Sequence, residues 1–279
     1  MSFYIHTETD LDTALAGLTA ADPRMIEIMS VAGRPPLRRR PDGFAGLASI
    51  VVAQQLSTAS AKAILGRLTA AFEPLDHAAI LRARRDKLAR IGLSAPKIRT
   101  LKAIAQAIDT GELDLAALVD CPADAAHNKL TAVHGIGPWT ADIYLLFCLG
   151  HADAWPAGDL ALQEAARLAF ALKRRPTPKD MGPLAEAWRP WRGAAACLLW
   201  SYYRVAKKRE GAPVEASKTI ALTAAPSATA NTVGTSRTSA VKQSTGKAAA
   251  KAGNKAPAKT RANASRPTLT TRRTHGRRA

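Results

Sequence analysis

The chain has 279 residues, with 40 lysines and arginines against 22 aspartates and glutamates, a formal net charge of +18. This excess of positive charge indicates a polyanionic partner. Three widely spaced cysteines set among apolar residues, Cys121, Cys148 and Cys197, argue against a disulfide framework or a zinc site. No apolar run could span a membrane, and the start of the chain does not resemble a signal peptide. We therefore expect a protein of the cytoplasm.

The positive charge is concentrated at the end of the chain. Residues 1–210 contain 27 basic and 21 acidic residues, whereas residues 211–279 contain 13 basic residues and one acidic residue. All fourteen aromatic residues also precede position 204. Residues 211–279 therefore lack the apolar surface needed for a core, and we expect a folded domain over 1–210 followed by a disordered basic tail. Such a tail binds phosphates without sequence preference, or serves only as a solvated extension.

The folded part is expected to be all-α. Apolar residues recur at spacings of three and four rather than in alternation; in the stretch 96–108 they stand at positions 98, 101, 104, 105 and 108. Glycines at 92 and 111 follow such runs, as helix ends require. Short turns are expected over 112–119 and 181–188. The predicted helices cover 10–20, 23–32, 43–54, 58–72, 84–91, 95–109, 122–133, 138–149, 159–172 and 190–207.

A helical hairpin is predicted over residues 122–149. Its turn reads HGIGPWT, so one helix breaks at Gly135 and Gly137 and the next restarts at Pro138. Glycines at this place let a phosphate approach the free N–H groups at the start of the new helix. We therefore expect Gly135, Gly137 and Thr140 to contact the DNA backbone. The turn alone is weak evidence for phosphate binding, because an ordinary turn between two packed helices has the same pattern. In its wider context, the string from Leu130 matches the helix-hairpin-helix element of DNA repair proteins.

Two further segments make the resemblance more specific. A Gly/Pro-rich loop, WPAGDLALQ over 155–163, follows the hairpin by about twenty residues, and a segment with three tryptophans extends from Trp188 to Tyr202. Together they resemble the helix-hairpin-helix/Gly-Pro-Asp superfamily of DNA glycosylases, in its branch of 3-methyladenine DNA glycosylase II. The resemblance covers residues 20–207 and implies a two-lobed helical fold. It leaves no room at the start for the mixed α/β domain of some members.

Asp159 is the catalytic residue that this resemblance implies. A glycosylase breaks the bond between a base and C1′ of deoxyribose, and the sugar acquires positive charge in the transition state. A carboxylate beside C1′ stabilises that charge and orients or deprotonates the attacking water. An aspartate before Leu-Ala-Leu is also typical of a helix N-cap, and the two roles are compatible.

The remaining site residues serve base flipping in this interpretation. By resemblance, Gln55 and Leu56 supply the wedge that fills the space left by the everted base, although Leu56 could equally belong to the core. Trp139 and Trp200 match stacking positions of the base pocket, where an electron-rich indole attracts a cationic alkylated purine. Some members carry a pocket aromatic four residues after the hairpin tryptophan. Here Ile143 stands there with Tyr144 beside it, so we include Tyr144 in the pocket.

We expect that the protein requires no cofactor. Relatives that also nick the strand place a lysine at the second residue after the hairpin GxG, where this chain has Trp139, so a monofunctional enzyme is predicted. Iron-sulfur relatives carry four clustered cysteines after the domain, and nothing beyond Cys197 could supply them, so no iron-sulfur cluster is expected. Similar hairpins hold Na⁺ or K⁺ through backbone carbonyls. The corresponding carbonyls belong to Thr131, Val133 and Ile136.

The function predicted from these features is hydrolytic excision of alkylated purines of the 3-methyladenine and 7-methylguanine type, the first step of base excision repair. The partner is double-stranded DNA carrying damaged bases, bound by a monomer associated with the nucleoid, or in the nucleus of a eukaryote. Three alternatives remain: a non-catalytic DNA-damage-binding protein, a glycosylase of other base specificity, and a glycosylase/lyase. Basic clusters such as Arg38–Arg40 are either solvated faces or contacts to backbone phosphates.

Overall fold

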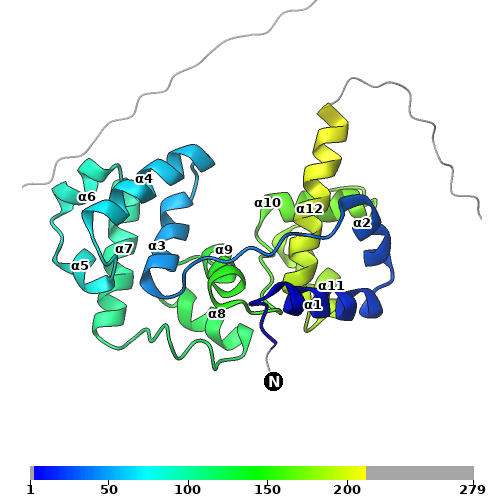
Figure 1. Cartoon of the computed structure of the whole chain (residues 1–279), viewed down its shortest axis with the longest axis horizontal. Helices are drawn as coiled ribbons and strands as arrows, with labels where there is room; N and C mark the ends of the chain where they lie inside the picture. Colours follow the sequence, from blue (N-terminus) through cyan, green and yellow to red (C-terminus); the bar gives the residue numbers. More distant parts are fainter. Residues whose placement is uncertain (1–2, 212–279) are drawn as a thin grey trace, which may run out of the picture. The chain divides into compact units, whose positions relative to one another are not determined.

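The computed structural model describes residues 3–211, and these form helices connected by turns and loops, without a strand (Figure 1). A single antiparallel bridge joins Tyr4 to His151. The all-α prediction is confirmed. No helix among the described residues is long and apolar enough to cross a membrane. The predicted basic tail, 211–279, lies outside the described residues except for Gly211.

The elements are α1 (Glu8–Ala21), α2 (Arg24–Ala32), α3 (Gly43–Ala53), α4 (Thr58–Ala71), α5 (His77–Arg82), α6 (Arg85–Ile91), α7 (Ala95–Asp109), α8 (Ala123–Thr131), α9 (Pro138–Tyr144), the π-helical η1 (Leu145–Leu149), α10 (Leu160–Ala169), α11 (Pro178–Ala185), the 3₁₀ turn η2 (Glu186–Trp188) and α12 (Arg192–Gly211).

One group of helices comprises α3 to α7. Helix α7 packs against α5, α6 and α3, and α4 packs against α3 and α6. Most of α3 is buried, because apolar residues occupy nearly every position between Phe44 and Val52. A helix that is apolar on all sides must lie within a core. Helix α3 also contacts α9, so this group leads directly to the hairpin.

The second group contains α1, α2, α10 and α12. Helix α12 contacts the other three and so forms the centre of this group. Trp188, completely buried, donates an indole hydrogen bond to Asp22 Oδ2 at 2.9 Å. Hydrogen bonds from the Arg24 guanidinium, together with that indole, lower the pKa of Asp22 to about 2. This charged contact joins the chain just before α2 to the turn that precedes α12.

The hairpin of α8 and α9 lies between the two groups (Figure 1), and α8 and α9 pack against each other. The sequence predicts one helix over 138–149, but the chain changes at Leu145 to the wider π-helical turn η1. All residues of η1 are buried, and Gly150 ends it in a left-handed conformation. Such π-helical turns within helices are often associated with functional sites.

Two helices are absent from the sequence prediction. Helix α5 has only six residues, too few for a helical period to be recognised. Helix α11 contains Pro183 in its interior, and a proline there removes a helical hydrogen bond and reads as a break. The prediction of only a turn over 181–188 was therefore wrong for its first half. Neither helix lines the cavity described next.

Candidate active site

Asp159 is the N-cap of α10 and lies where three helices meet. Its Oδ1 accepts hydrogen bonds from Leu162 N at 2.9 Å and from Trp200 Nε1 at 3.0 Å. Its Oδ2 accepts one from Trp139 Nε1 at 2.8 Å. Trp139 belongs to the first turn of α9, and Trp200 belongs to α12. The three hydrogen bonds fix both carboxylate oxygens, and the capping role does not exclude a catalytic one in this geometry.

A cavity of about 340 Å³ opens beside this carboxylate, and we refer to it as the Asp159 cavity. Phe147 of η1 stacks on Trp200 with ring centroids 5.7 Å apart. Arginines stand among its lining residues in addition to the apolar walls. The cavity thus combines stacking surfaces, one anchored carboxylate and positive charge. Its main apolar walls are Ile50, Ala53, Trp139, Ile143, Phe147 and Trp200.

A second, more open groove of about 500 Å³ continues from the first around Asp159 and Trp139. Gln55 and Leu160 are among the residues that line it. Leu160 is 62% exposed, the most exposed large apolar side chain in the described part of the chain. The sequence analysis did not identify it, since an apolar residue at a helix start gives no signal of its exposure. Its position next to Asp159 places an apolar contact surface beside the carboxylate.

Tyr144 does not line the Asp159 cavity. Its side chain is completely buried in the core, and burial raises the pKa of its phenol above the ordinary value. The physical reason is helical geometry: consecutive residues point about 100° apart around the axis, so Tyr144 cannot share the direction of Ile143. The lining residues from this part of the chain are Ile143 and, one turn on, Phe147. The assignment of Tyr144 to the base pocket is corrected accordingly.

The segment predicted as the wedge is a turn between α3 and α4. Gln55 has a φ of 56°, a left-handed conformation that costs a non-glycine residue free energy and often marks functional sites. Leu56 is 39% exposed, so it is not the buried core leucine of the alternative interpretation. Ser57 then caps α4 by accepting a hydrogen bond from Ser60 N. The turn therefore presents an apolar side chain to solvent next to the groove.

Lys97 and Thr140 hold this turn in place. The Lys97 ammonium, on α7, donates to the carbonyls of Val52 and Gln54, both at 2.8 Å. The Gln54 amide donates to Thr140 Oγ1 at 2.8 Å. Desolvation lowers the pKa of Lys97 below its usual value. Thr140 is only 2% exposed, so its hydroxyl supports the turn and is not accessible to a DNA phosphate, which corrects the assignment of this residue to backbone binding.

The two glycines of the hairpin turn, Gly135 and Gly137, have different surroundings, so glycine is needed at only one of them for folding. Gly135 has a φ of 86°, and a Cβ there would lie 2.2 Å from Thr100 Oγ1, so folding alone requires glycine. A Cβ at Gly137 would meet no atom within 4 Å, so the start of α9 is open at this position. The Val133 carbonyl, one of three predicted cation ligands, accepts a hydrogen bond from Ile136 N at 3.1 Å. A second lone pair remains for a cation, and that site stays a prediction.

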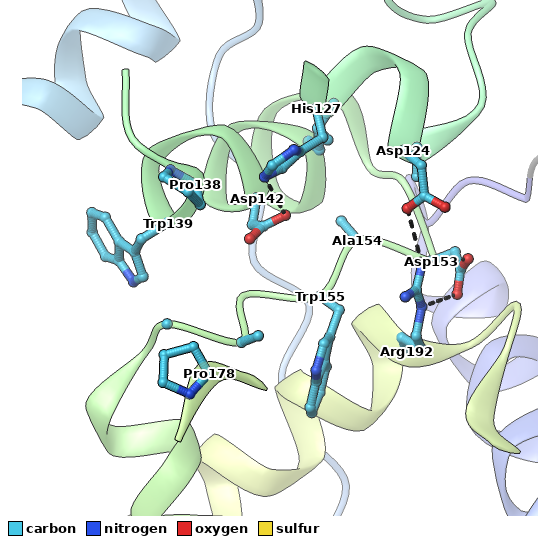
Figure 2. Close-up of a pocket in the computed structure, with 14 residues that line it drawn as sticks. Asp124, His127, Pro138, Trp139, Asp142, Asp153, Ala154, Trp155, Pro178 and Arg192 are labelled. Carbon is cyan, nitrogen blue, oxygen red and sulfur yellow. Dashed lines mark hydrogen bonds and ion pairs between the residues drawn. The ribbon is translucent and has the colours of Figure 1, made fainter. Parts of the chain in front are cut away.

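A different cavity, of about 450 Å³, lies on another side of Trp139 (Figure 2), and we refer to it as the Asp142 cavity. Asp142 of α9 points toward His127 of α8, with 3.7 Å between Oδ1 and Nε2. Asp142 is 8% exposed, and burial raises the pKa of its carboxyl group to about 8. Arg192 of α12 binds both oxygens of Asp153 at 2.7 and 2.8 Å. Arg192 also lies 3.5 Å from Asp124 of α8, and this ion pair connects the hairpin with α12.

Comparison with known proteins identifies the family. Residues 48–190 match the HhH-GPD superfamily of base excision DNA repair proteins. The match covers more than half of the chain and contains the hairpin, the Asp159 loop and the proposed wedge. The chain belongs to this superfamily, and the resemblance inferred from the sequence is confirmed.

Among curated relatives, the "Probable bifunctional transcriptional activator/DNA repair enzyme AlkA" of Mycobacterium tuberculosis is 34% identical over 209 residues. The match covers 69% of this chain and 40% of that protein, so the chain spans well under half of the mycobacterial protein's length. The DNA-3-methyladenine glycosylase of Bacillus subtilis is 28% identical over 218 residues, covering 71% of this chain and 70% of that protein.

Solved structures agree with these relatives. The DNA-3-methyladenine glycosidase of Bacillus halodurans superposes with a TM-score of 0.64 at 28% identity, covering 75% of this chain and 94% of the other. The 3-methyladenine DNA glycosylase Mag1 of Schizosaccharomyces pombe, in complex with abasic DNA, gives a TM-score of 0.60 at 28% identity, covering 67% of this chain and 95% of the other. The described residues therefore have the same fold as these glycosylases.

Proposed function

We propose that the chain is a monofunctional DNA glycosylase that everts a damaged nucleotide and hydrolyses the bond between an alkylated purine and deoxyribose. One observation carries this proposal: a carboxylate, that of Asp159, is held by two indole N–H groups at the edge of an aromatic-walled cavity. The names of the similar proteins, DNA-3-methyladenine glycosylases among them, support the same activity. The complex of one of them with abasic DNA, the product of base removal, supports the substrate.

Each group has a defined task in this reaction. The everted purine stacks in the Asp159 cavity, while the sugar remains in the adjoining open groove. The Asp159 carboxylate then faces C1′, stabilises the positive charge that develops on the sugar, and orients the attacking water. Its hydrogen bonds to Trp139 and Trp200 keep it in place, so little reorganisation is needed during the reaction. A purine alkylated at N3 or N7 is a cationic leaving group, so this modest assistance is sufficient.

The DNA contacts form the second part of the proposal. Leu56, supported by Gln55, fills the space left by the everted nucleotide. The exposed glycines of the hairpin turn, Gly135 and Gly137, give a DNA phosphate access to backbone N–H groups at the start of α9, with Na⁺ or K⁺ held on the carbonyls of Thr131, Val133 and Ile136. The protein acts as a monomer on duplex DNA in the nucleoid or nucleus, and needs no redox cofactor.

Product analysis tests the activity. Purified protein incubated with methylated duplex DNA is expected to release free 3-methyladenine and to leave an intact abasic strand that breaks only in hot alkali. No lysine lines the Asp159 cavity among the described residues, so borohydride should not trap a protein–DNA adduct. A trapped adduct would identify a glycosylase/lyase instead. Tight binding of damaged DNA without release of any base would identify the non-catalytic binding protein.

A further inference from the structure

Three arginines surround the mouth of the Asp159 cavity without an ion-pair partner among residues 3–211. Arg38 and Arg40 come from the extended segment between α2 and α3, and Arg204 comes from α12. All three side chains are exposed. Within the described part of the chain, the Arg40 guanidinium donates to Ser49 Oγ and the Arg204 guanidinium to Ser201 Oγ, both at 3.3 Å, and to no other side chain or carbonyl. Their donor capacity is therefore largely available to a ligand.

Several other arginines of residues 3–211 are engaged with carboxylates. Arg24 lies 2.7 Å from Asp22, and Arg192 binds Asp153 through two hydrogen bonds. The charge of these two guanidinium groups is therefore neutralised within the protein. Around the Asp159 cavity the chain supplies one carboxylate for three arginines, and that carboxylate is bound by indole and backbone N–H groups.

Backbone geometry explains why Arg38 and Arg40 face the cavity together. The segment is extended, with prolines on both sides, so alternate residues point in the same direction. Arg39 points the other way and donates to the Cys148 carbonyl at 2.9 Å. The Arg40 N–H donates to the Phe147 carbonyl, which fastens the segment to η1. The two cavity-facing guanidinium groups therefore start from an anchored backbone.

Arg204 lines the same cavity from a different element, α12. It follows Trp200 by four residues on α12, so the two side chains share a face of the helix. Arg204 therefore lines the cavity next to one of the proposed stacking rings. Positive charge from two separate segments converges on a space that is sized for a base.

We propose that Arg38, Arg40 and Arg204 tune the selectivity of the cavity among purine lesions: they raise the release of neutral bases that carry a carbonyl oxygen, such as hypoxanthine, relative to the release of permanently cationic alkylated bases. A guanidinium group offers N–H donors in a rigid fork that suits an oxygen acceptor, and its positive charge opposes a cationic ring. This inference rests on the proposed glycosylase function and specifies its substrate class. It departs from the cation-stacking preference expected from the tryptophans alone.

The same guanidinium groups could instead hold the phosphates that flank the everted nucleotide. The base is favoured as the ligand because all three arginines line the cavity itself. The two ligands have different consequences. Phosphate contacts affect every lesion equally, whereas base contacts change the ratio of rates between lesions.

Four defined lesions separate charge from oxygen content. 3-Methyladenine is cationic in DNA and lacks a carbonyl oxygen, 7-methylguanine is cationic and has one, 1,N⁶-ethenoadenine is neutral without one, and hypoxanthine is neutral with one. Single-turnover release from each duplex should be measured for the parent, for each single Arg→Gln variant and for R38Q/R40Q/R204Q. In the triple variant the ratio of the 3-methyladenine rate to the hypoxanthine rate should rise about tenfold, the effect of one lost hydrogen bond to a charged donor.

Two further variants sharpen the result. Arg204→Lys keeps the charge but loses the fork, so it should slow hypoxanthine and 7-methylguanine more than the two lesions without oxygen. Arg82→Gln, an exposed arginine on α5 outside the cavity, serves as the control and should leave all four rates unchanged. Thermal unfolding of each variant verifies that the fold is intact.

The outcomes are distinct. An equal loss on all four lesions would assign the arginines to the DNA backbone and overturn the proposal, as would unchanged ratios. If the parent protein released no base from any of the four duplexes, the proposed glycosylase function would fail. Release by the parent with unaltered ratios in the variants would reject only the selectivity.

Discussion

The two cavities that share Trp139 differ in how their charges are arranged. In the Asp142 cavity, the Arg192 guanidinium is bound to Asp153, and the Asp142 carboxyl group is buried beside His127 (Figure 2). In the Asp159 cavity, the carboxylate is accessible from an open groove, and the arginines at the mouth lack carboxylate partners among residues 3–211. Charges that are paired internally stabilise the position of the hairpin, whereas unpaired charges remain available for a ligand. The comparison assigns a structural role to the first cavity and binding to the second.

Among the residues that surround Asp159, the largest effect is expected from the indole donors of the Asp159 cavity. Trp139→Phe and Trp200→Phe keep an aromatic ring but remove the N–H groups that hold Asp159. Each hydrogen bond to a charged acceptor contributes about 1.5–3 kcal/mol, so each variant should lose about ten- to a hundredfold in base release. Trp191→Phe is the matched control, since its ring packs edge-on against Phe3 outside the cavity. Single-turnover rates that equal the parent's in both variants would show that the indole donors are not needed.

Lys97 offers a test of the proposed wedge with a control on the same helix. Lys97→Met leaves the carbonyls of Val52 and Gln54 without a donor and should loosen the turn that carries Leu56. We expect about a tenfold slower base release, with base eversion impaired in a 2-aminopurine fluorescence assay; tenfold corresponds to about 1.4 kcal/mol.

Lys102 provides the matched control for that variant. It donates to the carbonyls of Leu81 and Ala83, at 2.7 and 2.6 Å, in the same manner but at α5. Lys102→Met should lower the melting temperature by a similar amount and leave eversion intact. Equal loss of eversion in both methionine variants would mean that general destabilisation, rather than the wedge turn, limits the reaction.

The buried carboxyl group of Asp142 should make the stability of the protein depend on pH. The pKa of Asp142 is raised by burial to about 8, above the ordinary aspartate value, so the folded state binds a proton that the unfolded state has released. This group therefore lowers the free energy of unfolding as pH rises from about 4 to about 8. Asp142→Asn removes the titration, so the excess of its melting temperature over the parent's should be several degrees larger at pH 8 than at pH 5.

Asp22 is expected to show the opposite pH dependence of stability and serves as an internal comparison. Its pKa is lowered to about 2, so its contribution to stability is present above the ordinary aspartate pKa and is lost only as pH falls toward 2. Asp22→Asn should therefore be destabilised at both pH 5 and pH 8. A difference between Asp142→Asn and the parent that does not vary with pH would contradict the assigned burial effect.

The smallest effect on turnover is expected from the basic tail, which lies outside the described residues. Truncation after Gly211 removes 13 basic residues and one acidic residue. Release of a base from a short duplex should change little, because every residue of the Asp159 cavity remains. Binding to long DNA should weaken and depend less steeply on salt concentration. An unchanged salt slope would mean that the tail does not contact DNA.

The sequence allowed the fold class and the central residues of the site to be predicted, because their signals are local. Helical periodicity, the two hairpin glycines and the loop before Asp159 are each readable within a few residues. Trp139 and Trp200 lie 20 and 41 positions away from Asp159 in the sequence. They could be placed beside it only through resemblance to a family, since periodicity does not reveal such contacts.

The features that the sequence did not disclose depend on tertiary packing. Thr140 looks like a free hydroxyl at a helix start, yet the Gln54 amide covers it. Tyr144 is a plausible pocket aromatic until the direction of α9 is known. The arginines at 38 and 40 read as a solvated charge cluster, and only the anchoring of their segment to η1 places them at the cavity with Arg204.

The most direct test of the central claim is single-turnover release of 3-methyladenine by Asp159→Asn, measured together with its affinity for DNA that contains an abasic-site analogue. Asparagine keeps the size of the side chain but not its charge. We expect release to fall by at least about a hundredfold, as for loss of a major electrostatic contribution to a transition state, while affinity for the analogue stays within a few-fold of the parent's. Release at the parental rate would contradict the catalytic role of Asp159.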